Sequence, residues 1–245
     1  MISLVICSVD PGKFAAVTAM YKAALANVDW ELIEIHDAKS LAEGYNRGVA
    51  ASRGDILIFS HDDVELISPD LVGPLHRHLN RFDLFGVAGT TRIVNACWAS
   101  AGPPYIFGQV AHIVPNGDIM VDIYGAPRRS IGNIVGLGGM FLAGKRALFD
   151  KISFDAETFD GFHLYDIDFS HQAYRAGFKV GVVNDINFIH ASGGRFDEVW
   201  RKFAVRFELK WRADLPQAPP PVFQWSAAQV KTRAQALAVM NPSFW

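Results

Sequence analysis

Three polar side chains stand together directly after the apolar stretch 55–60, namely His61, Asp62 and Asp63. Two adjacent carboxylates repel each other, and their pKa values rise unless a cation neutralises them. Proteins commonly hold Mg²⁺ or Mn²⁺ with one or two carboxylates together with the phosphates of a substrate. The alternative is a solvated turn, since Asp is common where a strand ends. The triplet therefore predicts either a divalent-cation site for a phosphorylated ligand or an exposed turn.

A second cluster, 159–168, combines carboxylates with aromatic and histidine side chains. Asp166 and Asp168 stand just before, or within, the first turn of a helix that is predicted over 168–176. A carboxylate at this place caps a helix by accepting hydrogen bonds from the first backbone N–H groups, and Asp168 fits that role. One cap needs only one acid, so the other carboxylate could serve as a general base.

A third candidate lies late in the chain, where His190 precedes Gly193 and Gly194. A histidine that follows a strand is either a metal ligand or a structural residue. The two glycines form either a simple turn or a place where a phosphate can approach the backbone. The sequence has no G-x-G-x-x-G after its first strand, no Walker A motif and no G-x-S-x-G. A dinucleotide site, a P-loop and an α/β-hydrolase elbow are therefore not expected.

The first third of the chain predicts the strands and helices that position these residues. Short apolar stretches rich in β-branched residues alternate with segments whose apolar residues recur at helical spacing. Strands are predicted at 2–9, 30–35, 55–60 and 84–88, and helices at 14–28, 40–52 and 68–82. This alternation is typical of a parallel, doubly wound sheet. Ligands bind beyond the carboxyl ends of such strands, where Ser8, Val9, Asp37 and the 61–63 triplet stand.

The second half of the chain predicts a mixed arrangement. The turn-forming run Pro115–Asp118 joins two apolar stretches, 110–114 and 120–124, as in a β-hairpin. Further strands are predicted at 136–142 and 179–183, with helices at 145–149, 168–176 and a last one whose apolar face is Phe196, Trp200, Phe203 and Phe207.

Prolines then divide the chain. Pro216 and the run 219–221 break any regular element ahead of a helix predicted over 226–240. We therefore expect one domain over residues 1–215 and a proline-led helical extension over 216–245.

The composition suits one folded α/β domain. Half of the 245 residues are apolar and 12% are aromatic, which is enough to bury a sizeable core and excludes a disordered chain. A formal net charge of −2 argues against a protein whose main task is to neutralise the phosphates of nucleic acid. Cys7 and Cys97 are too few for a disulfide framework or a four-cysteine zinc site, and they suit a reducing compartment.

The sequence also bears on where the protein works. Its first basic residue is Lys13, so the apolar start lacks the basic region of a signal peptide. Apolar runs stay well short of the roughly 18 residues that a membrane-spanning helix needs. We therefore expect a cytoplasmic protein without a transmembrane segment, which could still touch a membrane surface.

Taken together, the motifs resemble those of the GT-A glycosyltransferases, in particular their family 2-like branch, over residues 2–211. The run 45–56 is similar to the family's N-x-G…A-x-G-D segment, and the 61–63 triplet falls on its D-x-D position. Here His61 replaces the first Asp of that motif, and Asp63 takes the place of the second. A single D-x-D-like triplet is common, but several motifs in the family's order are much more specific.

The later motifs continue the resemblance. Gly138–Leu142 is similar to the family's acceptor-side segment, and 159–169 is similar to its E-D-x-D block. In that block Asp166 falls on the catalytic base, and Tyr165 stands where Glu is usual. His190 corresponds to the late histidine that completes the metal site in many members. The block, with a Lys-Trp pair further on, is close to a subgroup named for a streptomycin-biosynthesis protein.

The resemblance implies a GT-A fold, with a mostly parallel central sheet flanked by helices and a smaller mixed or antiparallel second half. It implies a metal-dependent transfer of a sugar from a nucleotide-diphosphate-sugar donor to a hydroxyl acceptor, with inversion at the anomeric carbon. UDP-sugars are the commonest donors in the family. The acceptor would be a glycan or a small molecule, and a homodimer is compatible with the sequence.

The resemblance also implies roles for individual residues. Asp63 and His190 would hold Mn²⁺ or Mg²⁺ against the phosphates, and Asp166 would deprotonate the acceptor hydroxyl. The donor would be contacted by Ser8, Val9, Asp37, Asn46, His61 and Asp62, and the acceptor side would be formed by Gly139, Met140 and Asp168. Trp98, Trp200, Trp211 and Trp225 are either core residues or surfaces on which a sugar ring stacks, and the helical spacing of Trp200 favours the core.

Three other interpretations stay open. A sugar-phosphate nucleotidyltransferase also uses a parallel sheet and Mg²⁺, but 10–13 is a poor match for its glycine-rich basic loop. A metallohydrolase could be built on His61, Asp63 and His190 as a facial triad. A non-catalytic nucleotide or glycan binder is compatible with His61 and Tyr165 in place of the usual acids.

Overall fold

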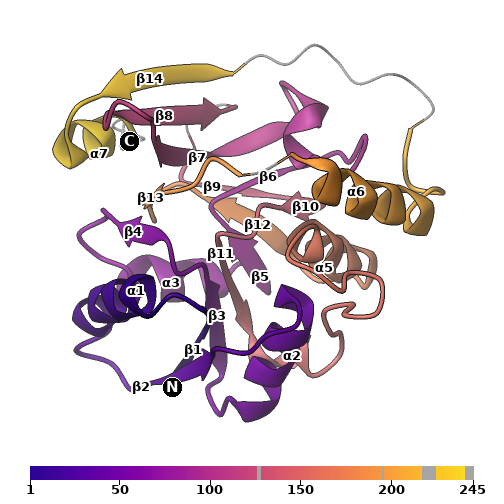
Figure 1. Cartoon of the computed structure of the whole chain (residues 1–245), viewed down its shortest axis with the longest axis horizontal. Helices are drawn as coiled ribbons and strands as arrows, with labels where there is room; N and C mark the ends of the chain where they lie inside the picture. Colours follow the sequence, from indigo (N-terminus) through magenta and orange to yellow (C-terminus); the bar gives the residue numbers. More distant parts are fainter. Residues whose placement is uncertain (126–127, 195, 217–224, 241–245) are drawn as a thin grey trace.

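A seven-stranded sheet forms the centre of the molecule (Figure 1). The computed structural model describes residues 1–125, 128–194, 196–216 and 225–240. The strands run in the order β2 (Trp30–Ile35), β1 (Ile2–Cys7), β3 (Ile56–Ser60), β11 (Phe141–Lys145), β5 (Leu84–Gly86), β12 (Val180–Val183) and β9 (Ser130–Gly132). β1 is parallel to both β2 and β3, and β12 is parallel to β5, as the alternating elements predicted.

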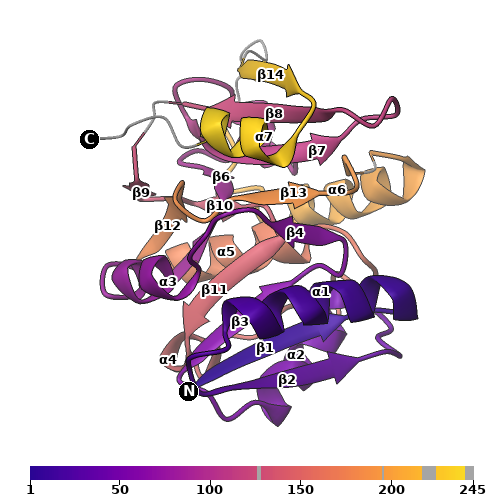
Figure 2. The ribbon, with the colours of Figure 1, turned by 90° about the vertical axis from the view of Figure 1, so that its left-hand side faces the viewer.

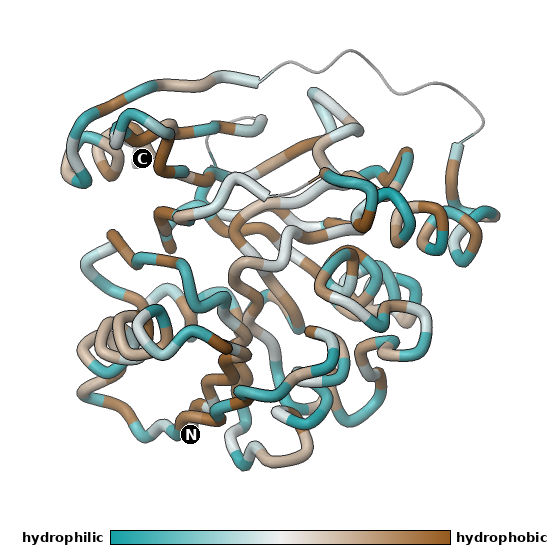
Figure 3. Tube along the Cα trace, in the orientation of Figure 1, coloured by the Kyte–Doolittle hydropathy of each residue, from teal (hydrophilic) through white to brown (hydrophobic). Residues whose placement is uncertain are grey.

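Helices cover both faces of this sheet. α1 (Pro11–Ala24) and α3 (Val72–Leu79) lie on one face, and α2 (Leu41–Ala51), α4 (Arg146–Phe149) and α5 (Tyr165–Arg175) lie on the other (Figure 1). Neighbouring residues of a strand point to opposite faces, so Leu4 of β1 packs with α1 and α3 whereas Val5 packs with α2. Figure 3 shows the central strands as hydrophobic, because both of their faces are buried.

The chain crosses from this sheet to a second one within the strand predicted at 84–88. The two parts separate at Val87, because β6 (Ala88–Thr90) pairs in the second sheet and β5 in the first. The Val87 carbonyl accepts a hydrogen bond from the Gln109 backbone N–H at 3.1 Å. Gln109 lies in a strand of the second sheet, so the chain begins to pair with that sheet at Val87.

The strand predicted at 136–142 divides in the same way. β10 (Gly136–Leu137) pairs with β6 in the second sheet, and β11 returns to the first. β11 runs antiparallel between β3 and β5. The central sheet is consequently parallel over β2, β1 and β3 and again over β5 and β12, with β11 reversed between the two groups and β9 antiparallel at the edge.

The second sheet contains the β-hairpin that the sequence predicted. Its strands run in the order β10, β6, β7 (Ile106–Ile113), β13 (Phe188–His190) and β4 (Val64–Leu66). β7 also pairs antiparallel with β8 (Ile119–Tyr124), and β8 pairs with β14 (Ser226–Val230). Figure 2 shows this sheet stacked on the first, with β8 and β14 farthest from it.

The prediction of a single helix over 226–240 is wrong for its first part. Residues 226–230 form β14, and α7 (Arg233–Met240) follows. β14 pairs over its whole length with an edge of β8, and this tertiary pairing outweighs the local helical preference. The proline run 219–221 lies outside the described residues.

α6 (Glu198–Lys210) packs against α5. Phe203 and Phe207 are buried together with Ile167, as the helical spacing predicted. Phe196 precedes the helix and is 59% exposed, so it does not belong to this packed face. Of the helices that the structure describes, none has the length and apolar character to cross a membrane.

Candidate active site

The carboxyl ends of β1, β2 and β3 bring several predicted residues to one edge of the central sheet. Ser8 and Asp62 meet there, and the Ser8 hydroxyl donates to Asp62 Oδ2 at 2.6 Å. Val9 is 83% exposed, and Asp37 forms an exposed ion pair with Arg47 at 2.7 Å. The parallel pairing of β1 with both neighbours explains this grouping, as predicted.

Asn46 does not belong to this edge group. Its Nδ2 donates to the Phe154 carbonyl at 2.8 Å, and its Oδ1 accepts from the Phe154 backbone N–H at 3.0 Å. Both ends of the amide are thus used to fasten α2 to the loop that contains Phe154. The expectation that Asn46 contacts a donor is replaced by this structural role.

His61, Asp63 and His190 converge into one cluster. Their ligand atoms lie within 4.8 Å of one another. His190 Nε2 is 3.0 Å from Asp63 Oδ1 and 3.2 Å from His61 Nδ1, and His61 Nδ1 is 3.9 Å from Asp63 Oδ1. Antiparallel pairing of β13 with β4 sets His190 opposite Val64, which places it beside the end of β3. The two sequence segments therefore meet as predicted.

The protonation states in this cluster suit a cation. Burial alone would raise the pKa of the Asp63 carboxyl, but the hydrogen bond and charge of His190 hold it well below its usual range. Burial and the neighbouring His190 lower the pKa of His61 to about 4. Asp63 is thus ionised and His61 neutral near pH 7. One carboxylate oxygen and imidazole nitrogens form a donor set that fits a divalent transition ion such as Mn²⁺.

Hydroxyl groups contact both imidazole rings of the cluster. The Tyr165 hydroxyl lies 2.7 Å from His61 Nε2, and the Ser192 hydroxyl lies 3.2 Å from His190 Nε2. His112, on β7, has its ring centroid 5.9 Å from that of His190. We did not predict His112, because its parallel pairing with His190 joins segments far apart in the sequence.

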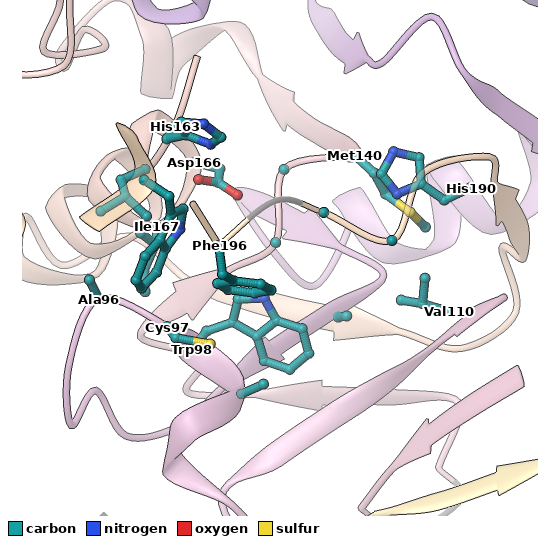
Figure 4. Close-up of a pocket in the computed structure, with 18 of the residues that line it drawn as sticks. Ala96, Cys97, Trp98, Val110, Met140, His163, Asp166, Ile167, His190 and Phe196 are labelled. Carbon is teal, nitrogen blue, oxygen red and sulfur yellow. The ribbon is translucent and has the colours of Figure 1, made fainter. Parts of the chain in front are cut away.

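A cavity of about 790 Å³ opens beside the cluster. His61 and His190 line it at the metal side, and Gly139, Met140 and Asp166 line it further along. Figure 4 shows Asp166, Met140 and His190 around this cavity. The volume lies in the range of ordinary ligand sites. The predicted acceptor-side residues Gly139 and Met140 and the predicted base thus share one cavity.

Asp166 occupies the first turn of α5. Burial raises the pKa of its carboxyl to about 6, although backbone N–H groups of Ile167, Asp166 and Gly139 offset part of the effect. A carboxyl with this pKa is mostly ionised near pH 7 and binds a proton more readily than an ordinary Asp. These are the properties that a general base requires.

Gly139 allows this arrangement. A Cβ atom at this position would lie 2.8 Å from Asp166 Oδ2 and 2.5 Å from the Tyr165 hydroxyl oxygen. Any larger residue would therefore displace both side chains.

Asp168 lies away from the cavity, contrary to the expectation that it forms the acceptor side. It is 0% exposed and accepts hydrogen bonds from Trp211 Nε1 at 2.8 Å, Gln172 Nε2 at 2.7 Å and Lys210 Nζ at 2.9 Å. Two residues along a helix turn through about 200°, so Asp166 and Asp168 face opposite ways. Asp168 thus joins α5 to the end of α6.

Comparison with known proteins agrees with the fold. A model of the family described as "Glycosyltransferase like family" matches residues 3–215, and the chain belongs to that family. No curated protein matches the sequence. The predicted GT-A class of fold is therefore confirmed, including its family 2-like character.

Three solved structures are similar to this chain at low sequence identity, and the first of them has a TM-score above 0.5. A mannosyltransferase from Pyrobaculum calidifontis in complex with GDP-Man and Mn²⁺ is 12% identical, with a TM-score of 0.53 over 99% of this chain and 70% of that one. GalNAc-T7 with UDP, GalNAc and Mn²⁺ is 11% identical, with a TM-score of 0.49 over 82% of this chain and 45% of that one. A197 from STIV is 11% identical, with a TM-score of 0.46 over 78% and 85%.

Proposed function

We propose that the protein is a metal-dependent, inverting glycosyltransferase that moves a sugar from a nucleotide-diphosphate-sugar to a hydroxyl acceptor. One observation carries the proposal: the His61–Asp63–His190 cluster and the carboxyl of Asp166 border the same region, with His61, His190 and Asp166 lining one cavity. A metal site next to a buried base is what such a transfer needs. Membership of the glycosyltransferase-like family supports this assignment.

The cluster would hold Mn²⁺ or Mg²⁺ through Asp63, His190 and His61. A bound divalent ion stabilises the charge of a leaving nucleotide diphosphate. Ser8, Val9, Asp37 and Asp62 lie beyond the cavity lining at the edge of the sheet, where they would contact the nucleotide. The donor would thus lie across the cluster, with its sugar toward the cavity. UDP-sugars are the first donors to test.

Asp166 would take the proton of the acceptor hydroxyl as that oxygen attacks the anomeric carbon. The attacking oxygen would form the new bond on the face of the sugar opposite the diphosphate, which leaves with the electron pair of the old bond, and attack from that face gives inversion. Asp122 also lines the cavity, but its Oδ1 accepts a hydrogen bond from Trp225 Nε1 at 2.9 Å. Asp166 is therefore the better candidate for the base. Such a base contributes roughly 10²–10⁴-fold to the rate.

Calorimetric titration with UDP, GDP and dTDP, each with and without Mn²⁺, tests the proposal. We expect one nucleotide to bind only when Mn²⁺ is present, which would also identify the donor base. Asp63→Ala should abolish this metal-dependent binding, whereas the exposed Asp70→Ala should not. Failure of all three nucleotides to bind, with or without Mn²⁺, would contradict the proposal.

A metallohydrolase is the second candidate, because two imidazoles and one carboxylate also form the facial triad of many iron and zinc enzymes. Metal analysis of the purified protein separates the two functions. A hydrolase would retain stoichiometric Zn²⁺ or Fe²⁺ through purification. A transferase of the kind proposed would lose its ion on dialysis and regain nucleotide binding when Mn²⁺ is added.

A further inference from the structure

The segment that follows the family match contributes to the cavity. The match ends at residue 215, and Trp225 stands ten residues further on. Trp225 nevertheless lines the same cavity as Asp166 and His190. It directly precedes β14, whose pairing with β8 begins at Ser226 opposite Ile123. The C-terminal segment is thus part of the site rather than a separate extension.

Three aromatic side chains cluster here, namely Trp98, Tyr124 and Trp225, and their neighbouring rings meet at interplanar angles of 84° and 56°. The centroids of Trp98 and Tyr124 are 5.1 Å apart, and those of Tyr124 and Trp225 are 5.5 Å apart. All three residues line the cavity. Trp225 keeps 40% of its surface exposed, so part of its ring is open to a ligand.

The position of Trp225 is fixed from two sides. Its indole Nε1 donates to Asp122 Oδ1 at 2.9 Å, and Asp122 belongs to β8. The following helix α7 buries Ala236 and Met240 in a cluster with residues of β7 and β8. Arg233, at the start of α7, forms an ion pair with Glu65 of β4. These contacts place the Trp225 ring at the cavity, next to β8.

The remaining wall of the cavity is also rich in aromatic residues. Phe162, Phe196 and Trp200 line it, and the rings of Phe196 and Trp200 are 5.0 Å apart. Figure 4 labels Phe196 and Trp98 among the residues that line the cavity. Each of these rings offers an apolar face of its own, and Asp122, Asp166 and His190 add polar groups to the same lining. Such a lining suits a ligand that combines a flat, weakly polar face with hydroxyl groups. A pyranose ring has such a C–H face, whereas an open-chain polyol has none.

We propose that residues 225–240 complete the acceptor site, and that Trp225 binds a pyranoside acceptor by stacking on its ring. This inference rests on the proposed function, because it takes the cavity as the place where the acceptor hydroxyl meets Asp166. The acceptor is therefore a cyclic glycoside rather than a peptide or a linear polyol. Trp225 determines acceptor affinity and has no part in binding the nucleotide.

Ligand-observed NMR titration of the full chain, with Mn²⁺ replaced by diamagnetic Mg²⁺, tests the proposal. The probes are methyl β-D-glucopyranoside, methyl β-D-galactopyranoside and methyl N-acetyl-β-D-glucosaminide, each compared with the corresponding alditol. We expect at least one pyranoside to bind and its alditol not to bind. Trp225→Ala should weaken that binding at least tenfold, and Trp225→Phe should weaken it less than threefold, since a ring remains.

Two controls separate the possible failures. Tyr174→Ala removes an exposed aromatic ring that does not line this cavity, and it should leave pyranoside binding unchanged. Nucleotide binding with Mn²⁺ should be the same in wild type and in both Trp225 variants, which also shows that they fold. Binding of no pyranoside, or unchanged binding in Trp225→Ala, would overturn the inference. If the wild-type protein binds none of the nucleotides UDP, GDP and dTDP, the proposed function itself is refuted.

Discussion

The hydroxyl of Tyr165 lies 2.7 Å from Nε2 of His61 and 3.2 Å from the carbonyl oxygen of Gly139. A carbonyl can only accept, and the hydroxyl has one proton to donate. Both hydrogen bonds can form at once only if the Tyr165 hydroxyl donates its proton to the Gly139 carbonyl. The hydroxyl oxygen then accepts a hydrogen bond from Nε2–H of His61. The lone pair of His61 then lies on Nδ1, which faces Asp63 and His190. Tyr165 therefore orients His61 for the metal that we propose the cluster binds, and it stands at the position where the similar family motif has an acid.

Tyr165→Phe should lower the affinity for Mn²⁺ by roughly tenfold, which is the usual effect of losing a residue that orients a metal ligand. The phenylalanine ring keeps the contact with Tyr45, whose centroid is 5.4 Å away, so the fold should be preserved. Calorimetric titration with Mn²⁺ measures the change, with Tyr174→Phe as the matched control. Equal Mn²⁺ affinity in wild type and Tyr165→Phe would show that Tyr165 does not orient His61.

Much of the fold could be predicted because local patterns determine it. The apolar stretches at 2–7, 30–35 and 56–60 form strands, and the turn Pro115–Asp118 closes the hairpin between β7 and β8. The division of 84–88 between two sheets could not be predicted, since both parts are equally apolar. The choice is made by distant partners, such as Gln109 for the Val87 carbonyl. β14 could not be predicted for the same reason.

The candidate site was predictable where chemistry is concentrated in a short motif. The 61–63 triplet, Asp166 and His190 each stand out by residue type, and the structure brings them to one region. Asn46 and Asp168 have equally suitable side chains, but packing directs them to Phe154 and to Trp211. A sequence motif indicates which groups are present and does not give the direction in which each points.

Asp166→Asn should lower turnover by roughly 10²–10⁴-fold, because asparagine cannot accept the proton of the acceptor hydroxyl. Nucleotide binding with Mn²⁺ should stay near the wild-type value, since Asp166 is not among the ligands of the metal cluster. Steady-state kinetics with a saturating donor and calorimetry on the same preparation measure both quantities. Turnover like that of the wild type in Asp166→Asn would exclude Asp166 as the base.

The pKa of about 6 for Asp166 predicts how activity and stability depend on pH. Turnover should fall about tenfold per pH unit below 6, because only the ionised carboxylate accepts a proton. The folded-state pKa lies above the ordinary value of 3.8, so protonated Asp166 favours the folded state. That stabilisation is complete below pH 4 and is lost as the pH rises through 6. Asp166→Asn should therefore raise the free energy of unfolding at pH 7, by at most on the order of 3 kcal/mol.

Thermal unfolding at pH 5 and pH 7 shows whether Asp166→Asn is more stable than the wild type. The gain in Tm of Asp166→Asn over the wild type should be larger at pH 7 than at pH 5. A variant that is less stable than the wild type at pH 7 would contradict the raised pKa.

Asp168→Asn should act on stability rather than on turnover. The change removes a buried negative charge that faces the Lys210 ammonium at 2.8 Å and leaves that ammonium with Asp155 as its ion-pair partner. Lys210 keeps a carboxylate partner, so the cost is that of weakened hydrogen bonds from Trp211, Gln172 and Lys210, on the order of 1–3 kcal/mol. Tm should fall by about 2–12 °C, and turnover of the folded enzyme should change less than threefold. Asp150→Asn, at an exposed position, is the control. A large loss of turnover in Asp168→Asn without a fall in Tm would instead place Asp168 in the active site.

Gly139→Ala should impair metal binding and turnover together, because one methyl group would collide with two functional side chains. The new Cβ atom would lie 2.5 Å from the Tyr165 hydroxyl oxygen and 2.6 Å from Asp166 Cβ, both well inside contact distance. Displacement of Tyr165 removes the support of His61, and displacement of Asp166 moves the base.

Gly132→Ala is the control, since its Cβ atom would only touch Phe82 at 3.5 Å. Calorimetry with Mn²⁺ and steady-state kinetics should show losses of at least tenfold in both quantities for Gly139→Ala. A loss in turnover alone would mean that Asp166 moves while Tyr165 holds His61, and would contradict the coupling of the two side chains through Gly139.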